Sequence, residues 1–167
     1  MVDDELRREL LRRVAVDQDA IKQSPPSRGS EPQDAWADVR TDNTEWLKGV
    51  ISEHGWPGAS LVGEPGAEGA WLLAQHSDHD LEFQRSCLEM LRQAVQDGEA
   101  KAWCLAYLTD RVRVAEGHQQ VFGTQYTDNA GSWEPYPIEE PGELDQRRAA
   151  VGLEPHAEYD QLMRAKP

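Results

Sequence analysis

The sequence predicts a mainly all-α fold, a compact multi-helix bundle with one small β-hairpin near residues 120–138. Two observations support this prediction. Apolar residues recur at helical spacing along most of the chain, in segments separated by stretches rich in Gly and Pro. Residues typical of strands gather in one region only, before the turn-like run at 128–131. A length of 167 residues with 38% hydrophobic content suits one core, so we expect a single helical domain over residues 1–167.

The expected helices follow the apolar pattern in order. Five longer helices are predicted at residues 2–22, 33–53, 67–76, 81–96 and 99–115, and two short closing helices at 144–151 and 155–164. Residues 23–32 are expected to form a loop between the first and second helices, because they are rich in Pro and Ser. The Gly- and Pro-containing stretch up to Gly66 is expected to be a second loop. Asp80 or Asp78 is the expected N-cap of the fourth helix, and Asp97-Gly98 its end.

The β-hairpin is expected to pair residues 120–127 with residues 133–138 across a turn at 128–131. Pro135 and Pro137 lack the N–H group that a central strand donates, so they confine the second strand to a sheet edge.

Composition excludes some classes of partner. The formal net charge is −14, from 31 acidic and 17 basic residues. This charge disfavours binding to nucleic acid or to an anionic membrane surface, and it suits a basic protein partner. No signal peptide and no run of about 18 apolar residues is visible, so we expect a cytoplasmic protein. Cys87 and Cys104 lie on apolar stretches, where buried thiols are expected.

Several polar residues interrupt the apolar helix faces. They are Asp17, Gln18, Asn43, His76, Gln84, Asp110 and Arg111. Burying a polar group without a partner costs about 1–3 kcal/mol, so one shared hydrogen-bonded pocket is an economical arrangement. The alternative is that each group is satisfied separately, at a helix end or at the surface.

The shared-pocket reading assigns a role to each residue. His76 is the expected acid/base group, because an unperturbed imidazole has a pKa of about 6.5. A carboxylate, with Asp80 and Asp110 as catalytic candidates and Asp78 as a further one, would orient it. Arg111 suits a carboxylate or phosphate group. The other expected substrate-binding residues are Gln84, Gln125, Thr124, Asn43, Asp17 and Gln18. The alternative for Asp110-Arg111 is a salt bridge that holds the last helices.

A metal site was weighed at the run Gln75–Asp80. His76 and Asp80 are four residues apart, and His76 and His79 are three apart, spacings that bring ligands together on a continuous helix. The expected helix break at Ser77-Asp78 removes that continuity. We therefore expect no metal, and the absence of any cofactor motif predicts no cofactor.

The chain resembles a bacterial family known only as a domain of unknown function. The resemblance covers most of residues 34–160 and rests on motifs that occur in order: Gly55-Trp56-Pro57, Gln75-His76-x-Asp78-x-Asp80, Ala106-Tyr107-Leu108-x-Asp110-Arg111-Val112, Gln120-x-x-Gly123-Thr124-Gln125 and Arg147-Arg148-x-x-Val151-Gly152-Leu153. It implies a shared fold and site but no reaction. Phe122 stands where the family usually has Tyr, and Ile21 where Arg is common.

Two functions follow from these observations. The first is a small cytoplasmic enzyme of hydrolase or lyase type that acts on a polar small molecule or peptide, with His76 and a carboxylate as acid and base and with Arg111 and Gln125 binding the substrate. The second is a non-catalytic acidic binding or immunity-type module that covers a basic protein partner.

Overall fold

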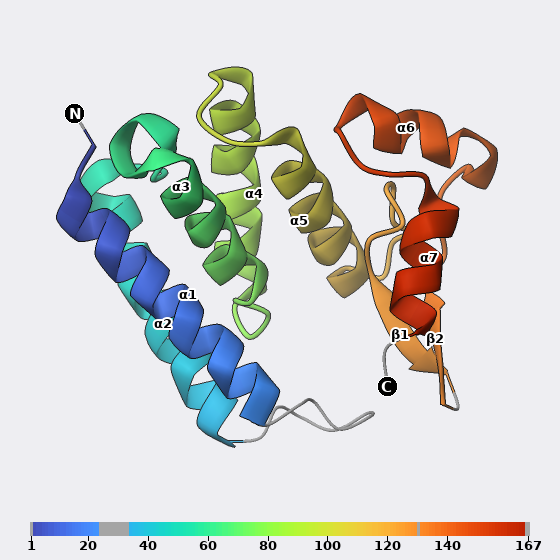
Figure 1. Ribbon diagram of the computed structural model, residues 1–167, viewed down its shortest axis with the longest axis horizontal. Coiled ribbons are helices and arrows are strands. Elements are labelled where there is room, and N and C mark those ends of the chain that lie inside the picture. The colour runs from blue at the N-terminus through green and yellow to red at the C-terminus, as the bar shows by residue number, and fades with distance from the viewer. Residues whose placement is uncertain (1, 24–33, 130, 166–167) are drawn as a thin grey trace. The chain divides into compact units, whose positions relative to one another are not determined.

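Seven α-helices and one two-stranded antiparallel sheet make up the part of the chain that the computed structural model describes, residues 2–23, 34–129 and 131–165 (Figure 1). The predicted mainly helical fold with one hairpin is confirmed. Apart from Gln23, the predicted loop 23–32 lies outside the described residues. The chain divides into two compact units, residues 1–101 and 102–167, and each is described by itself. The expectation of a single domain stays a prediction.

The first unit consists of four helices. They are α1 (Asp4–Gln23), α2 (Asp34–His54), α3 (Ala59–Gln75) and α4 (Leu81–Gln96). The helices α1, α2 and α3 contact one another, and α4 packs against α3 (Figure 1). Their facing apolar stripes supply a core that includes Leu10, Leu47, Val62, Leu73 and Leu91, all with almost no exposed surface.

The helix α3 begins earlier than the sequence predicted. Residues 59–66 were expected to be loop, but 59–62 form a helical turn that joins the longer part of α3 across a kink at Gly63. Gly63 has φ 72° and ψ 164°, a conformation that glycine adopts without steric cost. Pro65 lies in the first turn after this kink, where its missing N–H leaves no hydrogen bond unmade. Gly63 and Pro65 therefore lie within the first turns of α3 and do not form a loop before it.

The predicted cap of α4 is confirmed. Oδ1 of Asp80 accepts a hydrogen bond from the Phe83 N–H at 3.0 Å, which satisfies one of the free donors of the first turn. The predicted end at Asp97-Gly98 is also confirmed, because α4 stops at Gln96 and Gly98 takes a positive φ of 74°.

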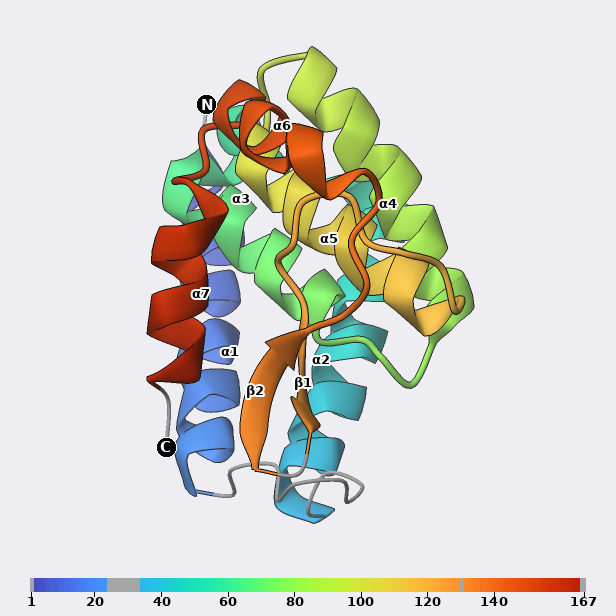
Figure 2. The same ribbon diagram turned by 90° about the vertical axis from the view of Figure 1, so that its right-hand side faces the viewer.

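The second unit consists of a helix, a hairpin and the closing helices. Its elements are α5 (Ala102–Ala115), β1 (Tyr126–Asn129), β2 (Ser132–Pro135), the short 3₁₀ helix η1 (Pro141–Glu143), α6 (Leu144–Ala150) and α7 (His156–Arg164). The strands pair antiparallel with Tyr126 opposite Pro135, and α7 lies against β2 (Figure 2). Buried apolar side chains of this unit include Leu108, Val112, Leu144 and Met163.

The helix α5 starts three residues later than predicted. Glu99 was expected to open it, but the Glu99 carbonyl accepts the Ala59 N–H and its carboxylate accepts the Ser60 N–H at 2.7 Å. Glu99 is therefore used to cap the start of α3.

The hairpin is shorter than predicted and displaced toward its turn. Residues 120–125 were expected to belong to the first strand, but they form a loop, and Asp128 and Asn129, expected in the turn, belong to β1. The physical reason is that the N–H groups of this loop are donated to a buried side chain instead of a neighbouring strand. Gly123, with φ 66°, provides the bend that this requires.

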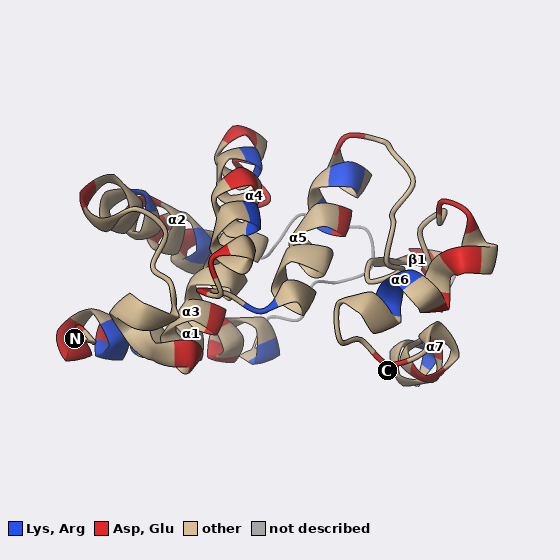
Figure 3. Ribbon diagram, turned by 90° about the horizontal axis from the view of Figure 1, so that it is seen from above, with Lys and Arg blue, Asp and Glu red and all other residues tan. Residues whose placement is uncertain are grey.

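Acidic and basic residues are interleaved on the helices (Figure 3). On α1, for example, Glu9 pairs with both Arg12 and Arg13. In the described ranges, no helix is long and apolar enough to cross a membrane.

Candidate functional site

The most distinctive polar contact of the first unit joins Asp17 of α1 to His76, the C-cap of α3. Nδ1 of His76 lies 2.7 Å from Oδ2 of Asp17. The Asp17 side chain has no exposed surface, and that of His76 keeps 15%. With Asp17 ionised, the Nδ1–H group donates to the carboxylate, which assigns the second ring nitrogen, Nε2, as the lone-pair nitrogen.

Two further donors hold the Asp17 carboxylate. Trp36 Nε1–H donates to Oδ1 at 3.4 Å, and Gln18 Nε2–H donates to Oδ2 at 3.2 Å. The Trp36 ring also meets the His76 ring edge-on, with centroids 6.1 Å apart. Asp17 is thus surrounded by side-chain donors from α1, α2 and the end of α3.

The other predicted residues of the first unit support the corner between α3 and α4. Gln84 is fully buried, and its Nε2 donates to the carbonyls of Ala74 and Gln75 and to Oδ1 of Asp78. Asp80, predicted to be catalytic, caps α4 and pairs with Lys48 at 2.8 Å. The Lys48 ammonium, foremost, holds the pKa of the Asp80 carboxyl below its usual range. Both carboxylate oxygens of Asp80 therefore serve structural contacts, one to the Phe83 N–H and the other to Lys48.

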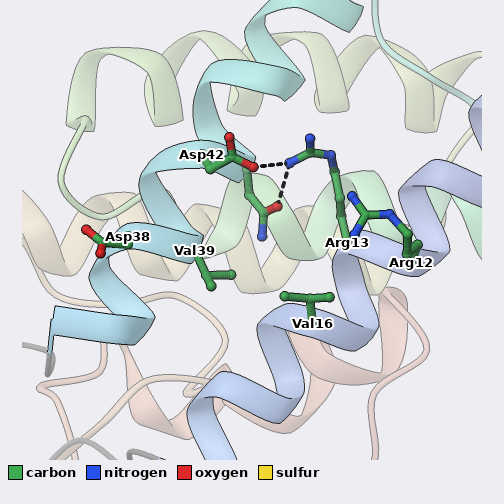
Figure 4. Close-up of a pocket in the computed structure, with 7 residues that line it drawn as sticks. Arg12, Arg13, Val16, Asp38, Val39 and Asp42 are labelled. Atoms are coloured by element: carbon green, nitrogen blue, oxygen red, sulfur yellow. Dashed lines mark hydrogen bonds and ion pairs between the residues drawn. The ribbon is translucent and has the colours of Figure 1, made fainter.

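Asn43, predicted to bind substrate, lies on a separate surface pocket between α1 and α2 (Figure 4). The pocket measures about 270 Å³. Its lining residues are Arg12, Arg13, Val16, Asp38, Val39, Asp42 and Asn43. Arg13 donates to Oδ1 of Asn43 at 3.1 Å and to Asp42 at 2.6 Å, so this pocket is organised around one arginine.

In the second unit, Asp110 of α5 is the centre of the loop 120–125. The N–H groups of Val121, Phe122 and Thr124 and the Thr124 hydroxyl all donate to its carboxylate, at distances of 2.7 to 3.2 Å. Burial raises the pKa of Asp110, and these four donors oppose that rise. Because the three N–H groups and the hydroxyl are all donors, the side chain acts as a carboxylate that shapes the loop.

The other predicted residues of this unit extend the same network. Arg111 Nη1 donates to Gln125 Oε1 at 2.9 Å, Gln125 Nε2 donates to Thr124 Oγ1 at 3.0 Å, and that hydroxyl donates to Asp110. These four residues, which the sequence analysis assigned to one shared pocket with His76, contact one another in the second unit. Further hydrogen bonds tie them to the surrounding loop, since Val121 and Phe122 donate to Asp110 and Gln120 bonds with the Gln125 main chain.

Two adjacent arginines of α6 hold the opposite face of the loop. Arg147 Nε donates to the Val121 carbonyl at 2.9 Å, and the fully buried Arg148 donates to the carbonyls of Phe122 and Glu154 at 2.7 Å. The motifs around Asp110, Gly123 and Arg147 thus have a common structural role, which is to fix one loop.

The structure forms two separate polar groups from the predicted site. Asp17, Gln18 and His76 meet in the first unit, and Asp110, Arg111, Thr124 and Gln125 meet in the second. The carboxylate that contacts His76 is Asp17, which we had assigned to substrate binding, and neither Asp78 nor Asp80 makes that contact within the described residues.

Sequence reasoning missed Trp36 and Arg40. Trp36 fits the apolar face of the second helix, so its spacing hides a polar role, but its buried indole N–H needs a partner and finds it in Asp17. Arg40 gave no signal beyond its charge. Its guanidinium carbon lies 5.2 Å from the centroid of the Trp36 ring.

Within the described residues, no group of three or more His, Cys, Asp or Glu side chains is placed to hold a metal ion. Cys87 and Cys104 are buried thiols, as predicted, and burial raises the pKa of the Cys87 thiol to about 12.

Fold and site together define a helical protein with a buried aspartate–histidine pair. The chain belongs to DUF6624, a family of unknown function whose model matches residues 4–166. The expected unknown-function family is therefore confirmed. The chain matches no curated protein and no solved structure.

Proposed function

We propose that this protein is a small acid/base enzyme of hydrolase or lyase type, acting on a polar small molecule or peptide. His76 is the proton-transfer group, and Asp17 is its positioning carboxylate. The observation that carries the proposal is the 2.7 Å contact between a fully buried aspartate and a histidine that keeps some exposed surface. Such a pair is the arrangement that general-base catalysis requires.

The pair supports one sequence of proton movements. Nε2 of His76 accepts a proton from water or from the substrate, and the resulting imidazolium is stabilised by Asp17 across Nδ1–H. The same proton then passes from Nε2 to the leaving group. Asp17 keeps its place beside Nδ1, because the N–H groups of Trp36 and Gln18 also donate to it.

A purely structural pair would link α1 to α3 without chemistry. The two readings differ in what His76→Gln does. Glutamine is close in size and still forms a hydrogen bond, so the fold is retained in both readings. Because an amide does not exchange protons near neutral pH, only the enzyme reading expects a loss of activity.

The test is a panel of ester, amide and phosphoester substrates, assayed for kcat/KM. We expect the wild-type protein to turn over at least one class, and His76→Gln to lose about 10²-fold or more. His79→Gln is the matched control, because His79 lies at the same corner but is exposed, and it should stay close to wild type. No turnover by the wild-type protein, or equal rates for both variants, contradicts the proposal.

A further inference from the structure

Arg40 of α2 carries a charge that the structure leaves unmatched. Its Nε is buried without a hydrogen-bond partner. Among the described residues, no carboxylate forms an ion pair with its guanidinium, whereas Arg7, Arg12 and Arg13 each pair with an acid. In a chain with 31 acidic and 17 basic residues, an arginine without such a partner calls for an explanation.

The position of Arg40 relates it to the Asp17–His76 pair. Its guanidinium packs over Trp36, with 5.2 Å between Cζ and the ring centroid. Trp36 in turn donates to Asp17 and meets the edge of the His76 ring. One indole therefore contacts the cation and both members of the pair.

A second observation places the Arg40 charge near the corner that carries His76. The pKa of His79, three residues after His76, is lowered by burial and then by the positive charge of Arg40. The Arg40 charge is therefore close enough to this corner to contribute to the low pKa of His79.

This geometry suits an oxyanion. A guanidinium held against an aromatic ring is pre-oriented, and its planar fork matches two oxygens of a carboxylate or phosphate.

We propose that Arg40 binds an oxyanion group, a carboxylate or a phosphate, of the molecule on which His76 acts. The proposal rests on the proposed function only for its link to catalysis, since the anion site itself depends on Arg40 and not on proton transfer. It makes Arg40 a substrate-binding residue and gives the substrate a negatively charged group.

The experiment titrates the full-length protein with inorganic phosphate and, separately, with acetate. It follows the Arg40 Nε–H and Trp36 Nε1–H signals by ¹⁵N NMR, assigned from their loss in Arg40→Lys and Trp36→Phe. Sodium chloride at matched ionic strength corrects for screening. We expect saturable shifts of both signals with at least one oxyanion and none with chloride, and the tighter anion identifies the group.

Variants sharpen the result. Arg40→Gln removes the charge and the fork, so binding followed at Trp36 should weaken at least tenfold. Arg92→Gln is the matched control, because Arg92 is exposed and lies 3.5 Å from Glu89, and its affinity should equal that of wild type. If Arg40→Gln does not fold, the titration of the wild-type Arg40 signal still decides. An Arg40 signal that does not saturate, or an unchanged affinity in Arg40→Gln, overturns the proposal.

The enzyme proposal and the anion-site proposal can be refuted independently of each other. His76→Gln should bind the oxyanion as tightly as wild type, because its imidazole does not contact the anion. Saturable binding in a protein without turnover retains the anion site and refutes the enzyme, whereas turnover that depends on His76 but survives Arg40→Gln with an unchanged KM refutes the anion site.

Discussion

Asp17 and Asp110 are both fully buried aspartates on helices, one in each unit, yet their surroundings differ in kind. Asp110 accepts hydrogen bonds from three main-chain N–H groups and one hydroxyl of a single loop. Asp17 accepts only from side chains in the bonds described, and one of them is an imidazole.

The difference teaches how to interpret a buried carboxylate. Main-chain donors cannot give up their protons near neutral pH, so a carboxylate enclosed by them fixes a conformation. An imidazole exchanges its proton near neutral pH, so a carboxylate that holds one is able to direct chemistry. The partners decide the role, and burial alone does not.

The largest effect on stability is expected when the Asp110 carboxylate, which holds the loop 120–125, is removed. Asp110→Ala leaves three main-chain donors and one hydroxyl without their acceptor in a site closed to solvent. We expect the free energy of unfolding to fall by about 3–5 kcal/mol, as when one partner of a buried charged group is removed. Urea denaturation followed by circular dichroism measures this loss.

The control for that variant is Asp145→Ala. Asp145 is exposed and its Oδ1 accepts one main-chain N–H, from His156 at 2.7 Å, so about 1 kcal/mol or less should be lost. Equal losses in the two variants would remove the structural role assigned to Asp110.

Substitution of Asp17 is expected to change stability less than that of Asp110, but to move the ring proton of His76. Asp17→Asn keeps the shape and one acceptor oxygen, so we expect a loss of about 1–2 kcal/mol in the free energy of unfolding. Its amide can donate to Nδ1 of His76, which moves the ring proton to Nε2. The ¹⁵N chemical shifts of the two ring nitrogens report the tautomer.

In the wild-type protein, neutral His76 should carry its proton on Nδ1. The same tautomer in wild type and Asp17→Asn would mean that Asp17 does not control the ring, and the contrast between the two aspartates would then be lost.

The smallest effect is a pH dependence in the second unit. Burial, and then the charge of Arg148, lower the pKa of His156 below its usual value. Below the pKa of the unfolded state, of about 6.5, the unfolded chain then binds more protons than the folded one. Stability therefore falls as the pH drops from 7 through the folded pKa, and it is fully present above the unfolded pKa.

The measurement compares urea denaturation at pH 7 and pH 5 for wild type and His156→Gln. The variant should lose less stability on acidification, by a small margin, because His156 is only partly buried and solvent screens its charge. A steeper loss in the variant would reverse the sign of the argument.

Local sequence rules predicted most of the helices. The cap at Asp80 and the end of α4 at Gly98 followed from side-chain chemistry close in sequence, and both are confirmed. The start of α3 did not follow, because Gly63 and Pro65 suggest a loop unless the positive φ of the glycine is known. The strand predicted over 120–125 failed for a long-range reason, since Asp110 takes the donors that a strand would have used.

The site shows the same limit. The pattern of polar residues on apolar helix faces singled out Asp17, His76, Asp110 and Arg111, but it does not say which of them meet. The bond between Asp17 and His76 spans 59 residues and that between Trp36 and Asp17 spans 19. Pairings at such separations depend on how the helices pack, which spacing within one helix does not reveal.

The adjacent arginines that hold the loop 120–125 have a consequence for synthesis. During translation, α5 and the loop 120–125 leave the ribosome before Arg147 and Arg148, so we expect the loop to bond to Asp110 while the carbonyls of Val121 and Phe122 still lack their donors. The loop is completed only when residue 148 has left the ribosome. A nascent chain stalled before that point should expose the loop to protease, and release of the arginine pair should close it.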